Sequence, residues 1–256
     1  MKQYKNLLVS GCSFSQDFWF NGIGGTPPSK TSSGDCVYIT DPKFSVELPK
    51  SWPGFLARKL KVTSFVNVAA SAHGNTLVAH SILECINRFC YIPEDTLIVV
   101  NLTEPWRLDL FCEYDHPEVD KKYIPWDQSF IPYSYLDTQD KTILELRKFI
   151  GFEQVGIITS NSIDFLFNFL QNKKIDFYFL LMNNFDKTAL KPVIDKFQEH
   201  LIELTPGSNM ISYGQLTKTC VSESNWHLGI DGSRQVANQI YRHIRDKQDD
   251  LYLSVL

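Results

Sequence analysis

Four short runs of apolar residues recur along the chain, and each is followed by polar or turn-forming residues. They cover residues 6–10 (NLLVS), 64–69 (SFVNVA), 96–102 (TLIVVNL) and 175–182 (IDFYFLLM). Short, near-continuous apolar runs are typical of strands that are buried on both faces, as in parallel sheets. The pattern therefore predicts a parallel sheet at the centre of the molecule.

Amphipathic helical patterns lie between and after these strands. Apolar residues recur at intervals of three and four, which gives each segment one apolar face. The four faces consist of Val78, Ile82, Cys85, Ile86 and Phe89; Ile163, Leu166, Phe167 and Leu170; Leu190, Val193, Ile194, Phe197 and Leu201; and Val236, Ile240 and Ile244. Asp231 and Ser233 are candidate caps of the last helix. The alternation predicts an α/β fold, a three-layer α/β/α sandwich with a parallel, flavodoxin-like, five-stranded sheet, in a single domain over residues 1–256.

Two long stretches, at about 16–50 and 104–137, have neither a strand pattern nor a helix pattern. The first contains several glycines and prolines, and the second is dense in aromatic residues interspersed with charges and prolines. Loops of this length are typical of lids or binding segments, whereas the alternative is a small ordered subdomain that packs its own aromatic side chains. We expect both insertions to lie outside the sheet, on the side of the carboxyl ends of its strands.

Composition is that of an ordinary globular protein and excludes several functional classes. Hydrophobic residues make up 43% and charged residues 21%, and the formal net charge is −4. No apolar run reaches the roughly 18 residues that span a bilayer, and the balanced charge provides no field for nucleic-acid binding. The N-terminus enters a strand without a signal-peptide pattern, which predicts a cytoplasmic location, with leaderless or virion-associated release as the alternative.

The cysteines show no spacing that favours a metal site. There are six, with no CxxC pair, and we expect them to be reduced and structural: Cys12, Cys36, Cys85, Cys90, Cys112 and Cys220. The sequence therefore implies no metal ion and no cofactor.

Ligands of open parallel sheets bind at the carboxyl ends of the strands, so the residues that follow each strand are the candidate functional residues. The first strand is followed by residues 11–15 (GCSFS), where Ser13 stands on a glycine turn. Its hydroxyl is a candidate nucleophile, and the alternative is a helix cap or a turn serine.

Three further segments supply candidates. Residues 70–75 (ASAHGN) are mostly small, which lets the backbone approach a ligand closely. The segment also contains His73. Residues 103–107 (TEPWR) place a hydroxyl, a carboxylate and a guanidinium close together, although Glu104 and Arg107 can also pair with each other. His227 precedes the last helix, where we expect it to lie across from Ser13.

Taken together, these segments resemble one family. Residues 11–15 look like the nucleophile block of the SGNH (GDSL-type) hydrolases, with Cys12 in place of the usual Asp. Residues 51–57 (SWPGFLA) and 67–75 (NVAASAHGN) are similar to a branch that is common among phage-encoded and uncharacterised bacterial members. The segment 101–103 (NLT) with Arg107 resembles the third block of that branch, and His227 with the helix after it resembles the final histidine block. The blocks follow the family's order from residue 6 to about residue 244.

The resemblance implies a role for each residue. Ser13 is the nucleophile, His227 the general base, Arg107 a substrate-binding residue, and the oxyanion donors are Ala72, Gly74, Asn75 and Thr103. Ala72 stands where the family has a glycine, and Thr103 stands where it has an asparagine. The acidic partner of the histidine is replaced by Ser224, with Glu223 and Asn225 as the other candidates. We expect a neutral acceptor or water at the second ring nitrogen rather than the Glu223 carboxylate.

The main hypothesis is a serine esterase or acyl hydrolase, for example a deacetylase of acylated glycans or lipids, with a Ser–His dyad or an incomplete triad. The alternative is a non-catalytic glycan- or ligand-binding module on the same fold, because fold does not imply activity. A third, weaker hypothesis is a flavodoxin-like nucleotide binder, against which the absence of a GxGxxG or GxxxxGKS pattern counts. The expected partner is a small-molecule, glycan or lipid ester.

Overall fold

The sheet at the centre of the protein contains four parallel strands. The computed structural model describes residues 2–12, 14–15, 37–39, 50–69, 73–89, 91–112, 129–134, 145, 150–183, 191–205, 208–222 and 225–253. The parallel strands are, in spatial order, β3 (Ser64–Asn67), β1 (Asn6–Ser10), β4 (Thr96–Leu102) and β7 (Asp176–Leu181). A short strand, β2 (Val37–Ile39), pairs antiparallel with β3 at the edge.

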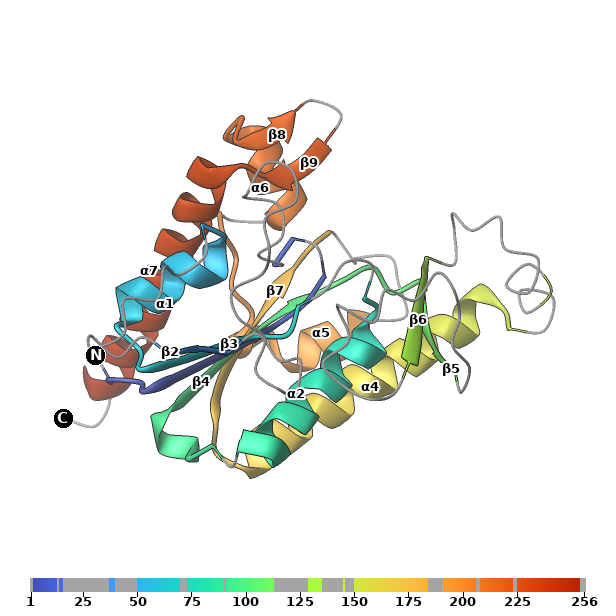
Figure 1. Ribbon diagram of the computed structural model, residues 1–256, viewed down its shortest axis with the longest axis horizontal. Helices are drawn as coiled ribbons and strands as arrows, with labels where there is room; N and C mark the ends of the chain where they lie inside the picture. The colour runs from blue at the N-terminus through green and yellow to red at the C-terminus, as the bar shows by residue number, and fades with distance from the viewer. Residues whose placement is uncertain are drawn as a thin grey trace.

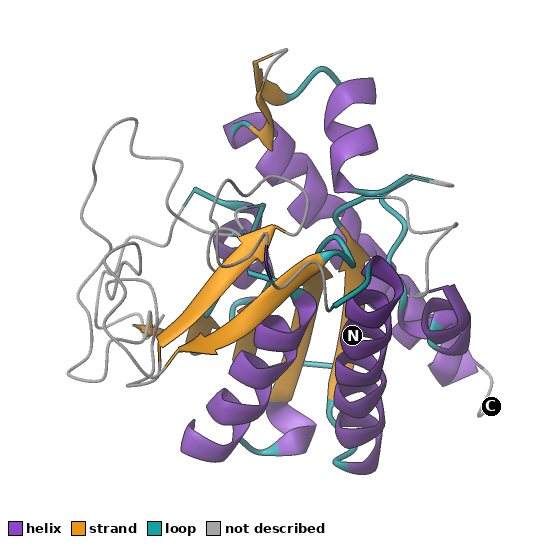
Figure 2. Ribbon diagram, turned by 90° about the vertical axis from the view of Figure 1, so that its right-hand side faces the viewer, coloured by secondary structure: helices purple, strands orange, loops and turns teal. Residues whose placement is uncertain are grey.

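Helices cover both faces of this sheet (Figures 1 and 2). One face is covered by α1 (Trp52–Leu60) and α7 (Ile230–Leu253), and α6 (Met210–Leu216) adds to the same core. The other face is covered by α2 (Asn75–Phe89), α4 (Phe152–Asn172) and α5 (Lys191–Lys196). Two 3₁₀ turns, Pro93–Asp95 and Gln198–His200, lie before β4 and after α5. The protein is therefore a three-layer α/β/α sandwich.

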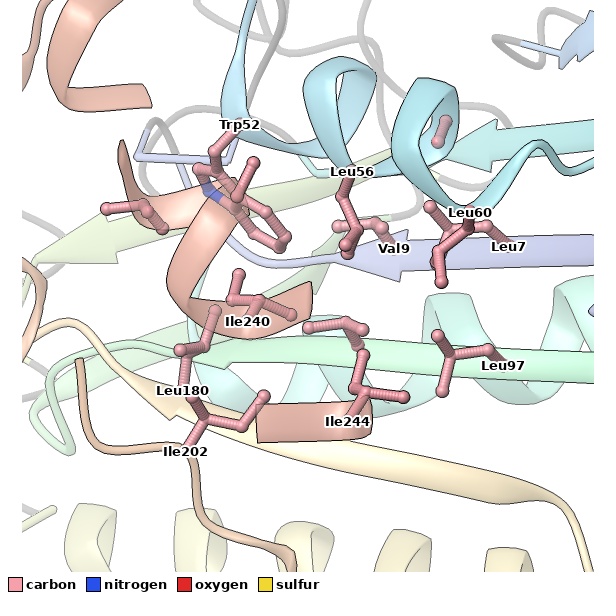
Figure 3. Close-up of a cluster of buried hydrophobic side chains, with 14 of the residues drawn as sticks. Leu7, Val9, Trp52, Leu56, Leu60, Leu97, Leu180, Ile202, Ile240 and Ile244 are labelled. Atoms are coloured by element: carbon pink, nitrogen blue, oxygen red, sulfur yellow. The ribbon is translucent and has the colours of Figure 1, made fainter. Parts of the chain in front are cut away.

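Alternate residues of the central strand serve opposite sides of the core. Leu7 and Val9 of β1 lie in the cluster under α1 and α7, whereas Leu8 lies in the cluster under α2 and α4. Figure 3 shows the first cluster, where Leu56 and Leu60 of α1 point toward β1. This two-sided burial explains why the strands have no polar face in the sequence.

Two antiparallel hairpins extend beyond the main sheet. The strands β5 (Arg107–Cys112) and β6 (Ser129–Ser134) pair within the second insertion, directly after β4. The strands β8 (Cys220–Ser222) and β9 (Asn225–Leu228) pair directly before α7. The first hairpin contributes Asp109, which contacts Gly74 after β3, and the second contributes His227, which contacts Phe14 after β1.

The predicted fold class is confirmed, with corrections to its details. Four strands are parallel rather than five, and β2 lies inside the 16–50 stretch that was expected wholly outside the sheet. The last helix begins at Ile230, so Asp231 and Ser233 lie in its first turn and are not its caps. Among the helices that the structure describes, none is long and apolar enough to cross a bilayer.

Candidate active site

The turn after β1 is held by side chains from two other elements. Ser13 lies outside the described residues, but its neighbours on both sides are described. The indole Nε1–H of Trp52 donates to the carbonyl oxygen of Phe14 at 3.1 Å, and the amide Nδ2 of Asn67 donates to the carbonyl oxygen of Ser15 at 2.8 Å. Both donors are buried, so the chain beside Ser13 is fixed by bonds that water does not compete for.

Neither Trp52 nor Asn67 was among the predicted site residues. Both residues lie in sequence segments that carry the family resemblance, Trp52 in residues 51–57 and Asn67 in residues 67–75, and this could have indicated their importance. Trp52 begins α1, where its ring is buried in the core and its N–H reaches the turn. These blocks therefore position the turn after β1 as well as packing the sheet.

Cys12 is directed into the core. Its side chain is fully buried, and its Sγ lies 3.4 Å from Sδ of Met182, which follows β7. Burial raises the pKa of the Cys12 thiol, although the charge of Arg107 opposes this effect. A buried thiol with a raised pKa is a poor nucleophile.

His227 has one ring nitrogen engaged with a neighbour on the same strand. Nδ1 lies 2.7 Å from Oδ1 of Asn225, and the backbone N–H of His227 donates to the same Oδ1 at 3.2 Å. Because this atom accepts the backbone N–H, it acts as an acceptor, so the ring Nδ1 carries the proton and donates it. This tautomer leaves Nε2 with the lone pair that a general base requires.

The imidazole of His227 also packs against the turn after β1. Its ring stacks on Phe14 with the centroids 4.4 Å apart and the planes 20° from parallel. Burial, and secondly the charge of Arg107, lowers the pKa of His227. The ring is therefore neutral at neutral pH and lies beside the residue that follows Ser13 in the chain.

Of the three candidate partners for His227, the structure places Asn225 at the ring nitrogen. Glu223 and Ser224 lie outside the described residues. A neutral amide oxygen thus fixes the tautomer, as a carboxylate does in a complete triad, but it brings no charge to stabilise an imidazolium.

The predicted oxyanion donors lie together after β3 and β4, and their polar groups are bonded to the protein itself. The N–H of Gly74 donates to Oδ1 of Asp109 at 2.7 Å. Asn75 and Thr103 exchange two hydrogen bonds, from Nδ2 to the carbonyl oxygen at 2.9 Å and from the backbone N–H to Oδ1 at 2.8 Å. The Thr103 hydroxyl donates to the carbonyl oxygen of His73 at 3.1 Å. Ala72 lies outside the described residues.

Asp109, on β5, was not predicted from the sequence. It also accepts the N–H of Leu77 at 2.7 Å, so it satisfies two N–H groups at the start of α2. Burial raises the pKa of Asp109 to about 6, against the opposing effect of these two hydrogen bonds. A Cβ on Gly74 would lie 2.6 Å from the carbonyl oxygen of Arg107, so only glycine allows α2 and β5 to approach this closely.

Arg107 lies among the titratable groups of this edge. Its charge influences the pKa values of Cys12, His73, Asp109 and His227. Only 15% of its side chain is exposed, its Nε is 3.6 Å from Glu104, and its Nη2 is 4.0 Å from Sδ of Met182. Nε and Nη1 are buried without a hydrogen-bond partner among the described residues.

Unpaired buried polar atoms gather at this edge of the sheet. Within the described residues they are Oγ of Ser15, Nδ1 of His73, both amide atoms of Asn101, Nε and Nη1 of Arg107, and Nε2 of His243. All except the His243 atom lie at or beyond the carboxyl ends of β1, β3 and β4. Buried polar groups are almost always paired, so this cluster indicates a place where a polar ligand completes the bonding. The described residues contain no group of three or more His, Cys, Asp or Glu side chains that could hold a metal ion.

Comparison with known proteins identifies a shared fold. No family model matches the sequence, and no curated protein matches it. Among solved structures, protein YXIM of Bacillus subtilis is 11% identical with a TM-score of 0.51, over 96% of this chain and 57% of that one. The two proteins share the fold. The chain spans a little over half the length of that protein.

Two further solved structures are similar over nearly their whole length. One is a catalytic mutant of Axe2, an acetylxylan esterase from Geobacillus stearothermophilus, 13% identical with a TM-score of 0.48 over 95% of this chain and 96% of that one. The other, from Veillonella parvula, belongs to the lipolytic protein G-D-S-L family and is 9% identical with a TM-score of 0.44 over 93% and 96%.

Proposed function

We propose that the protein is a serine ester hydrolase of the SGNH type, with Ser13 as nucleophile and His227 as general base. The observation that carries this proposal is the state of His227. Its Nδ1–H is held by Asn225, its ring stacks on Phe14, and its lowered pKa keeps it neutral at neutral pH. A neutral histidine with a defined tautomer beside a serine turn is suited to acyl transfer.

The reaction would proceed in two halves. Oγ of Ser13 attacks the ester carbonyl carbon while Nε2 of His227 takes the hydroxyl proton, and the carbonyl electron pair moves onto oxygen. When the oxyanion collapses, the C–O bond to the alcohol breaks and His227 returns the proton to the leaving alkoxide. Water then attacks the acyl-serine with His227 again as base, which releases the carboxylic acid and restores the serine.

The substrate class proposed is an acyl ester of a glycan, a lipid or a small alcohol. The aromatic residues of the second insertion favour a sugar ring or an acyl chain, and Trp106, in the described part of that segment, is partly exposed.

The variants Ser13→Ala and Cys12→Ala test whether the nucleophile is the serine hydroxyl or the neighbouring cysteine thiol. Ser13→Ala should abolish hydrolysis of 4-nitrophenyl acetate and labelling by a fluorophosphonate, because both need an activated hydroxyl. Cys12→Ala should retain most of the hydrolysis and most of the fluorophosphonate labelling, since the thiol is buried against Met182. The reverse ranking would assign the chemistry to the thiol.

The second candidate is a binding module that has kept the fold without the activity. The neutral acceptor at His227 favours it, because no charge supports an imidazolium there. A wild-type protein that neither hydrolyses 4-nitrophenyl esters nor reacts with a fluorophosphonate, yet binds an acylated oligosaccharide in calorimetry, would establish this candidate instead.

A further inference from the structure

Three of the four donors that the sequence motifs assign to the oxyanion are bonded within the protein, and the fourth, Ala72, lies outside the described residues. Gly74 gives its N–H to Asp109, Asn75 is tied to the backbone of Thr103, and the Thr103 hydroxyl is directed to the carbonyl of His73. Each bond is short and lies in a buried or partly buried setting, so breaking it during each turnover would leave a polar group unpaired. A described group that has unengaged donors is therefore better placed to stabilise the negative charge of the transition state than these three.

Arg107 has two buried N–H groups, at Nε and Nη1, that find no partner among the described residues of this edge. The ion pair with Glu104, at 3.6 Å, is too long to be a hydrogen bond. Its Nη2 lies 4.0 Å from Sδ of Met182, and the guanidinium also favours the thiolate form of Cys12 through its charge and a side-chain hydrogen bond, which opposes the rise that burial causes in the pKa of that thiol. A mostly buried guanidinium with only a long ion pair and two unpaired N–H groups is incompletely compensated, so its position is explained if a second anion appears beside it during function.

The location of Arg107 fits the reacting atoms rather than a distant part of the substrate. Its Nη2 and the Sγ of Cys12, the residue before Ser13, both contact Sδ of Met182, at 4.0 and 3.4 Å. Its charge also lowers the pKa of His227, which stacks against the residue after Ser13. With 15% of the side chain exposed, a single oxygen can reach it more readily than a bulky charged substituent. The unpaired amide of Asn101, in β4, adds a second polar group at the same edge.

We propose that Arg107 is a catalytic residue that donates hydrogen bonds to the oxyanion formed at the ester carbonyl, in place of the bonded donors Gly74 and Asn75. This inference rests on the proposed ester hydrolysis. A fixed donor in a site of low dielectric stabilises developing charge strongly, because no reorganisation is required at the moment of reaction.

The test compares Arg107→Gln and Arg107→Lys on two esters, 4-nitrophenyl acetate, which has no charge, and 4-nitrophenyl succinate, which has a carboxylate. Arg107→Gln should lower kcat on both esters by about 10²–10³-fold with KM little changed, and Arg107→Lys should recover part of kcat. Fluorophosphonate labelling should slow with kcat, since the phosphonyl oxygen takes the place of the oxyanion. Arg245→Gln, at an exposed arginine paired with Asp246, is the matched control and should have wild-type kinetics.

Two further readouts separate catalysis from a structural role. Arg107→Gln should melt close to the temperature of the wild type, because it removes two buried N–H donors that have no hydrogen-bond partner among the described residues and only a long ion pair with Glu104. The acid limb of its kcat/KM profile should move to higher pH, because Arg107 lowers the pKa of His227. If Arg107→Gln does not fold, Arg107→Ala with added guanidinium provides the same test, with partial rescue of kcat expected.

Three results would overturn the proposal, and they are distinguishable. Wild-type activity of Arg107→Gln on the neutral ester, with a raised KM only on the succinate ester, would show that Arg107 recognises a charge on the substrate. No rescue of Arg107→Ala and a proportional loss of stability would show a structural role. A wild-type protein that is inert toward both esters and toward fluorophosphonate would reject the proposed function, and this inference with it.

Discussion

The side-chain oxygen of Asn225 accepts two hydrogen bonds from one residue, His227, through the ring Nδ1–H at 2.7 Å and the backbone N–H at 3.2 Å. The amide therefore performs the orienting part of an acidic residue's role without its charge. The usual carboxylate contributes in both ways, since it fixes the tautomer and stabilises the imidazolium. The two contributions can be separated at this position by substitution.

Asn225→Asp should increase activity. The carboxylate would occupy the position of the amide oxygen, raise the pKa of His227 and stabilise its protonated form, which we expect to raise kcat up to about tenfold, or roughly 1.4 kcal/mol of barrier. The acid limb of the pH–rate profile should move to higher pH at the same time. Asn225→Ala should lower kcat about tenfold or more, because the ring loses its acceptor.

Glu223→Gln is the control for this pair of variants. Because an amide already holds His227, we expect Glu223→Gln to change the rate by less than about tenfold, whereas His227→Ala should nearly abolish it. A large loss from Glu223→Gln, together with no effect of Asn225→Ala, would show that the carboxylate rather than the amide supports the base.

The parts of the fold that were predicted from the sequence are those with strong local patterns. The strands at 6–10 and 96–102 have the predicted bounds, because continuous apolar runs are closed by turn residues at both ends. The helix predicted over 190–201 is instead shorter, ending at Lys196, because the chain after it joins the edge of β7 through the Phe179–Leu201 bridge. Such non-local pairing, which also adds β2 to the sheet, leaves no periodic signal in the segment itself.

In the candidate site, too, local sequence patterns predicted some features, whereas others depend on non-local contacts. That Gly74, Thr103 and Arg107 gather at the carboxyl edge followed from their positions after parallel strands. The sequence did not predict which of their N–H groups already donate hydrogen bonds within the protein. The acceptor of the Gly74 N–H, for example, is Asp109, which lies on a hairpin strand more than thirty residues away. A sequence indicates which residue types reach an edge, but their bonding depends on partners that the tertiary fold brings.

Gly11→Ala should destabilise the protein and reduce its activity. A Cβ at this position would lie 2.9 Å from Cβ of Asn101 and 2.9 Å from Oγ of Ser15, so β1 and β4 would have to separate where the turn after β1 begins. We expect a loss of about 1–3 kcal/mol in the free energy of unfolding, measured by urea denaturation. Gly151→Ala is the matched control, since nothing lies within 4 Å of its added Cβ, and its change should stay below about 1 kcal/mol. Equal effects of the two variants would contradict the packing argument.

Asp109→Ala should weaken the start of α2. The carboxylate accepts the N–H groups of Gly74 and Leu77, and both would lose their acceptor in a partly buried position. The expected cost is about 1–3 kcal/mol in the free energy of unfolding, with the largest loss of hydrogen-exchange protection at the first turn of α2. Asp231→Ala, at an exposed aspartate in the first turn of α7, should cost about 0.5 kcal/mol or less. Similar losses for both variants would mean that the Asp109 contacts add nothing beyond an ordinary helix-end charge.

The stability of the protein should fall in acid partly through His73. Burial, and secondly the charge of Arg107, lowers the pKa of His73 from 6.5 to about 3. Between these pH values the unfolded chain binds a proton at this residue and the folded chain does not, so stability decreases as the pH falls, with a slope that approaches about 1.4 kcal/mol per pH unit from this group. His73→Gln removes the titration while keeping a polar side chain of similar length. The free energies of unfolding of wild type and His73→Gln, measured in urea from pH 7 to pH 4, should therefore converge as the pH falls. Parallel curves over that range would show that His73 is protonated as readily in the folded protein as in the unfolded chain.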